Sequence, residues 1–160
     1  MTALGPTDRL DLADLVHRYA AAVDERDPGA VAALFTADGV LASPRPPRHL
    51  DPVEEATGPV AIEAAMGRLS GLALTRHAVV GVVLTADPAG GSDGADGTTG
   101  RVACTAHHVL PDGTDLVWHL TYRDRYRRTG AGWRFARRDL HVDVVEKRAV
   151  AAARGLRDRP

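Results

Sequence analysis

Apolar residues recur at steps of three and four near the start of the chain, which is the spacing of one face of a helix. The repeat lies between Asp11 and Asp24 and predicts an amphipathic helix there. Its apolar members are Leu12, Leu15, Val16, Tyr19, Ala20 and Val23. Thr7 or Asp8 is expected to cap the start of this helix, and the Pro-Gly pair after Asp27 breaks the pattern.

Two shorter helices are expected after the first one. The nearer helix carries Val31, Leu34 and Phe35 on one face. The other runs from Val60 to Leu69, and a proline precedes it at a position that the first turn of a helix tolerates. Between them, residues 36–39 form a turn and residues 40–42 predict a short strand.

The segment between Ser43 and Pro59 is rich in proline. Pro44, Pro46 and Pro47 lack the N–H group that a central strand donates to its neighbour. The segment is therefore expected to be a loop, and a loop of this length in a compact domain is often a lid or a binding loop.

Strand-like patterns fill the second half of the chain. Four strands are expected, over His77–Thr85, Arg101–Leu110, Asp115–Arg128 and Trp133–Val145. Residues 86–100 are rich in Gly and Asp and are expected to form a mobile hairpin tip. Because helices precede a meander of antiparallel strands, the order predicts an α+β domain whose curved sheet folds around the helices.

The third of these strands has two chemically different faces. One face bears several arginines and is expected to meet solvent. Its members are Val117, His119, Thr121, Arg123, Arg125 and Arg127. The other face is expected to meet the helices, and it carries Trp118, Leu120, Tyr122, Asp124 and Tyr126. Because Asp124 interrupts this apolar face, its carboxylate needs a partner inside the protein.

The turn before this strand decides which of two neighbouring histidines points inward. A two-residue turn at Asp112 and Gly113 would place His107 opposite Trp118. His107 is therefore expected inside and His108 outside. A loop one residue longer would exchange them, because a shift of one residue moves every side chain of a strand to the other face.

Composition and charge narrow the classes of function. A chain of 160 residues fits one domain, assigned to residues 1–148 with a tail at 149–160. The net charge of −1 gives no general attraction to nucleic acid or an anionic membrane, and no apolar run is long enough to span a bilayer. The N-terminus does not resemble a secretory signal, and Cys104 is the single cysteine, which excludes a disulfide framework. A cytoplasmic protein is expected.

Asp24 and His77 are the residues best suited to chemistry. A histidine beside a carboxylate in an apolar pocket transfers protons near neutral pH. Tyr19 precedes Asp24 by five residues near the end of the predicted first helix, and His77 heads an apolar strand. Each residue also has a plainer interpretation. Tyr19 could be a core residue, Asp24 a solvated residue at a helix end, and His77 a residue whose hydrogen bonds are satisfied at the edge of a strand.

No metal or cofactor is expected. His49 lies in the proline-rich segment and is expected to be exposed. Asp139, His141 and Asp143 share a strand face, but neighbours on such a face are about 7 Å apart, too far to hold one metal ion well. The sequence also lacks a Gly-rich phosphate loop, a nucleophile elbow and a zinc-protease motif.

Three segments in the same order resemble the SnoaL-like proteins of the nuclear-transport-factor-2-like superfamily. They read LVHRYAAAVDERDPGAVAALFTADGVL, TRHAVVGVVL and LTYRDRYRRTGAGWRFARRDLHVDVV. The resemblance covers Asp8 to Glu146 and implies a cone-shaped α+β barrel. The superfamily includes scytalone dehydratase, bile-acid dehydratase, steroid isomerases, polyketide cyclases and non-catalytic subunits.

The resemblance also implies roles for individual residues. Asp24 and His77 fall on an aspartate and a histidine of the scytalone-dehydratase-like enzymes, and Tyr19 keeps the Tyr–Asp separation of the bile-acid dehydratases. Tyr122 falls near a polar position of the same site, and His107 or His108 would fill the role of a second histidine.

In that reading His77 is a general base, Asp24 orients it, and the two tyrosines donate hydrogen bonds to a developing enolate. The remaining lining residues expected around the pocket are Val16, Phe35, Leu69, Trp118, Leu120, His108 and Asp124. The expected partner is a hydrophobic, polyketide- or steroid-like small molecule in secondary metabolism, and a homodimer is expected.

Two other functions stay open. The chain could be a non-catalytic module that binds a small ligand or supports a larger enzyme, which would be favoured if Asp24 and His77 were more than about 6 Å apart with no pocket between them. It could instead be an epoxide-opening hydrolase or cyclase. That function needs a second acid, for which Asp124 is the candidate.

Overall fold

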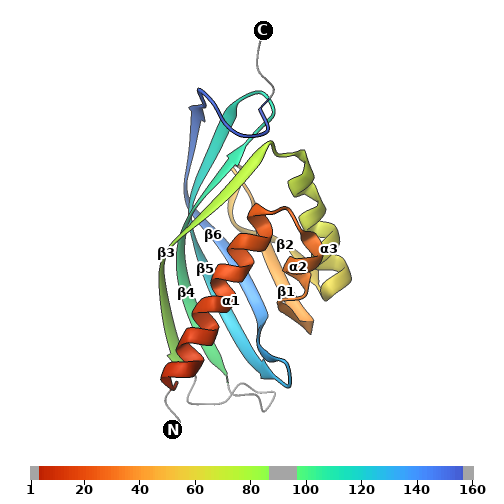
Figure 1. The fold of residues 1–160 in the computed structure, drawn as a ribbon, viewed down its shortest axis with the longest axis vertical. Helices are drawn as coiled ribbons and strands as arrows, with labels where there is room; N and C mark the ends of the chain where they lie inside the picture. Colours follow the sequence, from red (N-terminus) through yellow and green to blue (C-terminus); the bar gives the residue numbers. More distant parts are fainter. Residues whose placement is uncertain (1–3, 87–96, 157–160) are drawn as a thin grey trace.

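The computed structural model describes residues 4–86 and 97–156, in which six strands form one sheet in the order β2-β1-β6-β5-β4-β3 (Figure 1). The strands are β1 (Phe35–Arg45), β2 (His49–Thr57), β3 (Leu74–Ala86), β4 (Thr98–Val109), β5 (Thr114–Thr129) and β6 (Gly132–Ala149). The helices are α1 (Pro6–Asp24), α2 (Pro28–Ala32) and α3 (Pro59–Met66), followed by the 3-10 helix η1 (Gly67–Gly71).

The sheet is mixed. β1 runs parallel to β6, with Val40 beside Arg137, whereas the other neighbouring strands are antiparallel. The expected α+β class and the curved sheet that folds around a helix are confirmed (Figure 1). The expectation of a purely antiparallel sheet is corrected, because the chain returns from β5 through a hairpin and lays β6 beside the much earlier β1.

Helix α1 packs against the inner face of the sheet through the apolar stripe predicted for it, whose residues are buried. The helix begins at Pro6 and not at Asp11, because proline is already set for the first helical position. Gly5 is the N-cap residue and no side chain caps the helix, so the predicted caps at Thr7 or Asp8 are wrong. Asp8 instead accepts a hydrogen bond from the Trp133 indole at 3.3 Å.

The proline-rich segment forms a hairpin and not a loop. β1 continues to Arg45, and β2 follows after a short turn that contains a cis Pro46–Pro47 bond. Pro44 lies where the pairing between β1 and β2 shifts register, and β2 is the edge strand of the sheet. Bulges and edge strands are the places where a sheet tolerates proline, so the prolines do not prevent strand formation here. The prediction that Phe35 belongs to the second helix is wrong, because α2 ends at Ala32 and Phe35 opens β1.

The loop between β4 and β5 is one residue longer than the predicted turn. The amide of Leu110 donates to the carbonyl of Thr114 at 2.7 Å, which leaves three residues in the loop. The last of them, Gly113, has a φ of 84°, a value that glycine adopts without strain. His107 therefore pairs with Val117 and His108 with Leu116, and the expected faces of the two histidines are exchanged.

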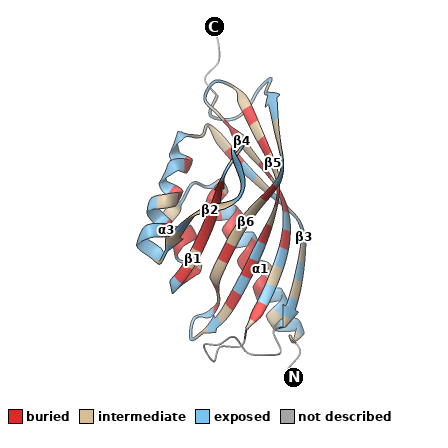
Figure 2. Ribbon diagram, turned by 180° about the vertical axis from the view of Figure 1, so that it is seen from behind, coloured by how far each residue is buried: buried red, intermediate tan, exposed pale blue. Residues whose placement is uncertain are grey.

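Buried and exposed residues alternate along β5 as predicted, over most of its length (Figure 2). Leu120, Tyr122, Asp124 and Tyr126 are buried on the inner face. Val117 is also buried, at 1% exposure, although the alternation had placed it on the solvent face. The pairing of β5 with β6 shifts register after His119, which interrupts the strict alternation there.

The predicted hairpin tip and the predicted C-terminal tail are only partly covered by the described residues. Residues 87–96 of the predicted hairpin tip lie outside the described residues, but Ala86 and Thr98 on either side are paired. β6 ends at Ala149, and the following Val150 donates its amide to the carbonyl of Gly113 at 2.9 Å. The proposed boundary between a domain and a tail stays a prediction. Among the described residues, every helix is too short or too polar to cross a lipid bilayer.

Candidate active site

The end of α1 is held against the start of β3. Arg26 leaves the helix with a φ of 56°, and its guanidinium donates to the carbonyl of Leu72 at 2.7 Å. A longer contact, at 3.4 Å, joins the same guanidinium to the carbonyl of Ala73. These bonds tie the helix end to the segment that leads into β3, and they bring Asp24 next to His77.

Asp24 and His77 make two hydrogen bonds with each other. The ring Nδ1–H of His77 donates to Oδ1 of Asp24 at 2.8 Å, and the backbone amide of His77 donates to Oδ2 at 3.0 Å. The two side chains are 14% and 6% exposed, respectively. Because a carboxylate accepts hydrogen bonds, Nδ1 carries the proton in the neutral ring, and Nε2 is left with a free lone pair.

His108 stands beside His77 on the inner face, where His107 had been expected. The centres of the two rings are 5.8 Å apart in an edge-to-face arrangement. The Nδ1–H group of His108 donates to the carbonyl of Leu116 at 3.1 Å, so its Nε2 also has a free lone pair. Burial, reinforced by the nearby His77, lowers the pKa of His108 to about 4, which keeps this ring neutral at pH 7.

Both histidines line a cavity of about 380 Å³ between the helices and the inner face of the sheet. Most of its wall is apolar, as in ligand pockets generally. The remaining lining residues are Tyr19, Val23, Leu41, Ser43, Pro44, Arg45, Pro46, Met66, Arg68, Leu69, Leu72, Leu110, Leu116, Trp118, Leu120, Tyr122 and Leu140.

Tyr19 and Tyr122 form part of this wall and contact each other edge to face, with ring centres 5.8 Å apart. The guanidinium of Arg138 lies 4.2 Å from the centre of the Tyr19 ring and 4.1 Å from that of Tyr122. Burial raises the pKa of Tyr19 to about 12, and burial also raises the pKa of Tyr122. Both phenols therefore keep their protons and can donate hydrogen bonds at neutral pH.

Asp124 does not line the cavity, contrary to the sequence-based expectation. Its carboxylate accepts two hydrogen bonds from Arg138, at 2.8 and 2.7 Å, and both side chains are fully buried. The hydroxyl of Tyr126 donates to the same carboxylate at 2.7 Å. Burial disfavours the charged guanidinium, but the neighbouring carboxylate outweighs it and raises the pKa of Arg138. Asp124 thus has the partner that the sequence required, directly across the strand pair.

Two other expected wall residues also lie outside the cavity. Val16 is 1% exposed and Phe35 is 5% exposed, and both belong to the packed core. Phe35 packs against Phe135, with ring centres 5.2 Å apart. They support the wall from behind, because their helical and strand positions face the core and not the space beside His77.

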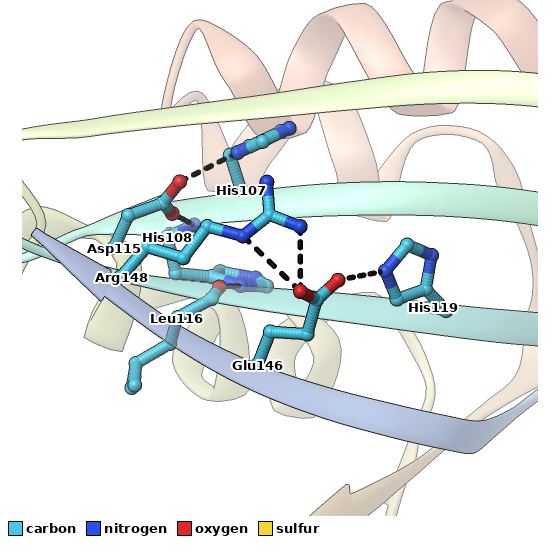
Figure 3. A network of polar contacts seen from close by, with 7 residues as sticks. All are labelled: His107, His108, Asp115, Leu116, His119, Glu146 and Arg148. Carbon is cyan, nitrogen blue, oxygen red and sulfur yellow. Dashed lines mark hydrogen bonds and ion pairs between the residues drawn. The ribbon is translucent and has the colours of Figure 1, made fainter. Parts of the chain in front are cut away.

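His107 points to the outer face of the sheet, where it joins a separate polar network (Figure 3). Its Nδ1 atom lies 2.6 Å from the carboxylate of Asp115. Farther along the same face, Nε2 of His119 lies 2.6 Å from Glu146, which also pairs with Arg148. Because His107 and His108 are consecutive strand residues, they point to opposite sides, and only His108 reaches the cavity.

The sequence-based reading missed several cavity residues. Arg45 lies at the end of β1 and Arg68 lies in η1, and neither arginine was named as a pocket residue, although Leu69 beside Arg68 was. The proline-rich segment was noted as a binding loop, which was the only available signal for Arg45. No signal in the sequence pointed to Arg68.

Asp24 also faces a second hollow of about 380 Å³, on the side away from the first cavity. Arg26, Arg76 and Arg154 line this hollow with Asp24. The nearest guanidinium nitrogen of Arg76 is 4.0 Å from Oδ2 of Asp24. Within residues 4–86 and 97–156, no three His, Cys, Asp or Glu side chains are grouped to hold a metal ion.

Comparison with known families supports the resemblance seen in the sequence. Residues 6–139 match the SnoaL-like domain, which is most of the chain. No curated protein matches the chain in sequence.

Solved structures with the same fold come from several bacteria. A candidate aromatic ring hydroxylase from Novosphingobium aromaticivorans has a TM-score of 0.75 and 23% identity, covering 90% of this chain and 95% of that one. A candidate scytalone dehydratase from the same organism has a TM-score of 0.71 and 19% identity, with 92% of each chain covered. ActVI-ORFA from Streptomyces coelicolor has a TM-score of 0.66 and 19% identity, covering 84% of this chain and 96% of that one. At these identities the likeness establishes the cone-shaped α+β fold.

Proposed function

This chain belongs to the SnoaL-like domain family, and on that premise we propose that it is an acid/base enzyme that needs no cofactor. The reaction is a dehydration, an isomerisation or a cyclisation of a hydrophobic molecule of polyketide or steroid type, in secondary metabolism. The observation that carries this proposal is the Asp24–His77 pair, joined at 2.8 Å, at the wall of an apolar cavity.

His77 acts as the general base. Its Nδ1–H group is held by Asp24, so Nε2 is the atom that accepts a proton from a carbon next to a substrate carbonyl. The Asp24 carboxylate stabilises the imidazolium that forms, because opposite charges in a poorly hydrated site attract strongly. A positioned base of this kind contributes about 10²- to 10⁴-fold to the rate.

Tyr19 and Tyr122 are the proposed donors to the enolate oxygen. Both hydroxyls stay protonated at neutral pH, because burial raises the pKa of each phenol. Arg138 lies behind the two rings and supports them, with its own charge paired by Asp124.

His108 accepts a hydrogen bond and does not act as the acid. A histidine whose pKa is about 4 is neutral at pH 7, and the one proton of its ring is already bound to the Leu116 carbonyl. In a dehydration, the proton taken by His77 would therefore return to the leaving hydroxyl. The carbon–hydrogen and carbon–oxygen bonds break, water leaves, and His77 ends neutral as it began. In an isomerisation, the same proton would return to another carbon.

Asp24 also connects the base to the second hollow. Its carboxylate touches His77 on one side and lines the hollow with Arg76 on the other.

A co-crystal experiment tests the proposal. The protein would be soaked with fused-ring aromatic ketones and steroid ketones, since a cavity of about 380 Å³ is near the lower end for ligand sites and favours compact molecules. We expect the carbon next to the ligand carbonyl within about 3–3.5 Å of His77 Nε2. A ligand that is bound with its carbonyl far from His77 would favour the non-catalytic binding module.

Asp124, the candidate acid of the epoxide-opening alternative, does not line the cavity. It is fully buried against Arg138 and Tyr126. No observation therefore favours this function over proton transfer.

The homodimer and the cytoplasmic location stay predictions. The proposed interface is the outer sheet face that bears Arg123, Arg125 and His119. Both of these arginines are exposed. Val144, on the neighbouring strand β6, is 49% exposed. Size-exclusion chromatography with light scattering would give the oligomeric state directly.

A further inference from the structure

The charged side chains that line the cavity, Arg45 and Arg68, are both basic. The two histidines of the proposed site are the other nitrogen bases in its wall. Among the described residues, no carboxylate lines this cavity, because Asp24 lies behind His77 and Asp124 lies behind the tyrosines. A purely apolar ligand would gain nothing from two guanidinium groups in its wall.

Arg45 and Arg68 share one carboxylate. Glu54, on the neighbouring strand β2, pairs with Arg45 and lies 3.4 Å from a guanidinium nitrogen of Arg68. Two positive charges against one negative charge leave a net positive charge at this edge of the cavity. The side chains of Arg45 and Arg68 are 65% and 55% exposed, so their bonds to Glu54 are hydrated and weak enough for a ligand anion to replace.

The two arginines lie across the cavity from the histidines. Arg45 is on β1 and His108 is on β4, and the sheet order places β6 and β5 between these strands. Three strand spacings correspond to about 14 Å along the sheet, and the curvature of the sheet shortens the direct path. The wall between them is apolar and includes Leu120 and Leu140. The cavity therefore has one basic end, an apolar middle and one proton-transfer end.

We infer that the substrate is an acidic fused-ring ketone, which binds with its anionic group between Arg45 and Arg68 and its carbonyl at His77. This inference rests on the proposed function for the carbonyl end alone. Without a ligand, Glu54 holds the two guanidinium groups in position, and the anionic group of the ligand displaces it on binding. Uncharged steroid-like ketones would then be poor substrates.

A pair of fluorescent dyes separates charge recognition from apolar binding. The anionic dye is 8-anilinonaphthalene-1-sulfonate, and the neutral dye is N-phenyl-1-naphthylamine, which lacks only the sulfonate. Dissociation constants would be measured at low salt for the wild type and for Arg45→Gln, Arg68→Gln and Glu54→Gln. Arg18→Gln is the matched control, because Arg18 is an exposed arginine paired with Asp14 on α1.

We expect the wild type to bind the anionic dye more tightly than the neutral one. Each of Arg45→Gln and Arg68→Gln should weaken binding of the anionic dye by about 5-fold and leave the neutral dye unchanged. Glu54→Gln should tighten binding of the anionic dye, because the competing carboxylate is gone. The control should change neither constant.

Two results would overturn the inference, and they are distinguishable. If both dyes bind equally well and the arginine variants change nothing, the anion subsite does not exist, while proton transfer at His77 is untouched. If neither dye binds, the cavity is closed in solution, and the proposed function fails together with the subsite.

Discussion

Asp24 accepts hydrogen bonds from both the backbone amide and the ring Nδ1–H of His77, at 3.0 and 2.8 Å. One carboxylate therefore fixes the position of the strand and the orientation of the ring at the same time. The amide bond holds β3 against the end of α1, and the ring bond selects which imidazole nitrogen faces the cavity.

Replacement of Asp24 by Asn should separate these two roles. The amide oxygen can still accept one hydrogen bond, so the fold should survive. The loss of the negative charge removes the support for the imidazolium, and kcat should fall at least about 100-fold. Steady-state kinetics together with a thermal melt would check this. Asp14→Asn, at an exposed position on α1, is the control, and equal activity of the two variants would contradict the assignment.

The neighbouring histidines His107 and His108 provide a matched pair of variants. Replacement of His108 by Ala enlarges the cavity beside His77 and removes a hydrogen-bond acceptor, so kcat/KM should fall by about 10-fold or more. Replacement of His107 by Ala should change kcat/KM by less than about 2-fold, because this ring lies on the outer face with Asp115. The reverse result would mean that the two faces are exchanged in solution.

The stability of the protein should fall as the pH is lowered from about 6.5 to about 4. Burial lowers the pKa of His108 from 6.5 to about 4, so in this range the unfolded chain binds a proton that the folded chain does not. Above pH 6.5 both states are neutral at this residue and its contribution is constant. The loss amounts to on the order of 3 kcal/mol.

Urea unfolding of His108→Gln at pH 4 to 7 would measure that contribution. The pH dependence of its free energy of unfolding should be shallower than that of the wild type. His49→Gln, at an exposed position, should retain the wild-type slope. A slope unchanged by His108→Gln would mean that this histidine is not neutral and buried in solution.

The buried pair of Asp124 and Arg138 should be a stability element and not a catalytic one. Arg138→Met leaves a buried carboxylate without its partner and should lower the free energy of unfolding by about 3–5 kcal/mol. The double variant with Asp124→Leu should recover much of this loss, because no charge is then left unpaired. Chemical denaturation of the wild type, the single variants Arg138→Met and Asp124→Leu and the double variant would measure it, and full additivity of the two single changes would disprove the coupling.

The main features of the candidate site could be predicted where they depend on helix and strand periodicity. The apolar stripe of α1 places Tyr19 inside, and the alternation of β5 does the same for Tyr122. The partnership of Asp24 with His77 came from the family resemblance, since nothing in the spacing of two residues 53 positions apart indicates contact. The need of Asp124 for a partner followed from burial alone, whereas the identity of Arg138 required the strand register.

Other features depended on single residues in turns and could not be predicted. Whether His107 or His108 faces the cavity depends on a loop of three residues instead of two, and Gly113 is compatible with both. Pro44 argued against a strand, but the register shift where it lies accommodates proline, and Pro46 lies in the turn between β1 and β2. Arg45 was missed because its segment was assigned to a loop, and Arg68 was missed although its neighbour Leu69 was expected in the pocket.

Exchange of the protons next to the carbonyl of 2-tetralone in heavy water tests the central claim most directly, because it reports proton transfer without knowledge of the natural substrate. The exchange rate would be followed by NMR with wild type, His77→Gln and Asp24→Asn at equal concentration. We predict that the wild type accelerates exchange at least about 100-fold over the His77→Gln variant, with Asp24→Asn in between. Equal rates for all three proteins, with 2-tetralone shown to occupy the cavity, would contradict a role for His77 as a base.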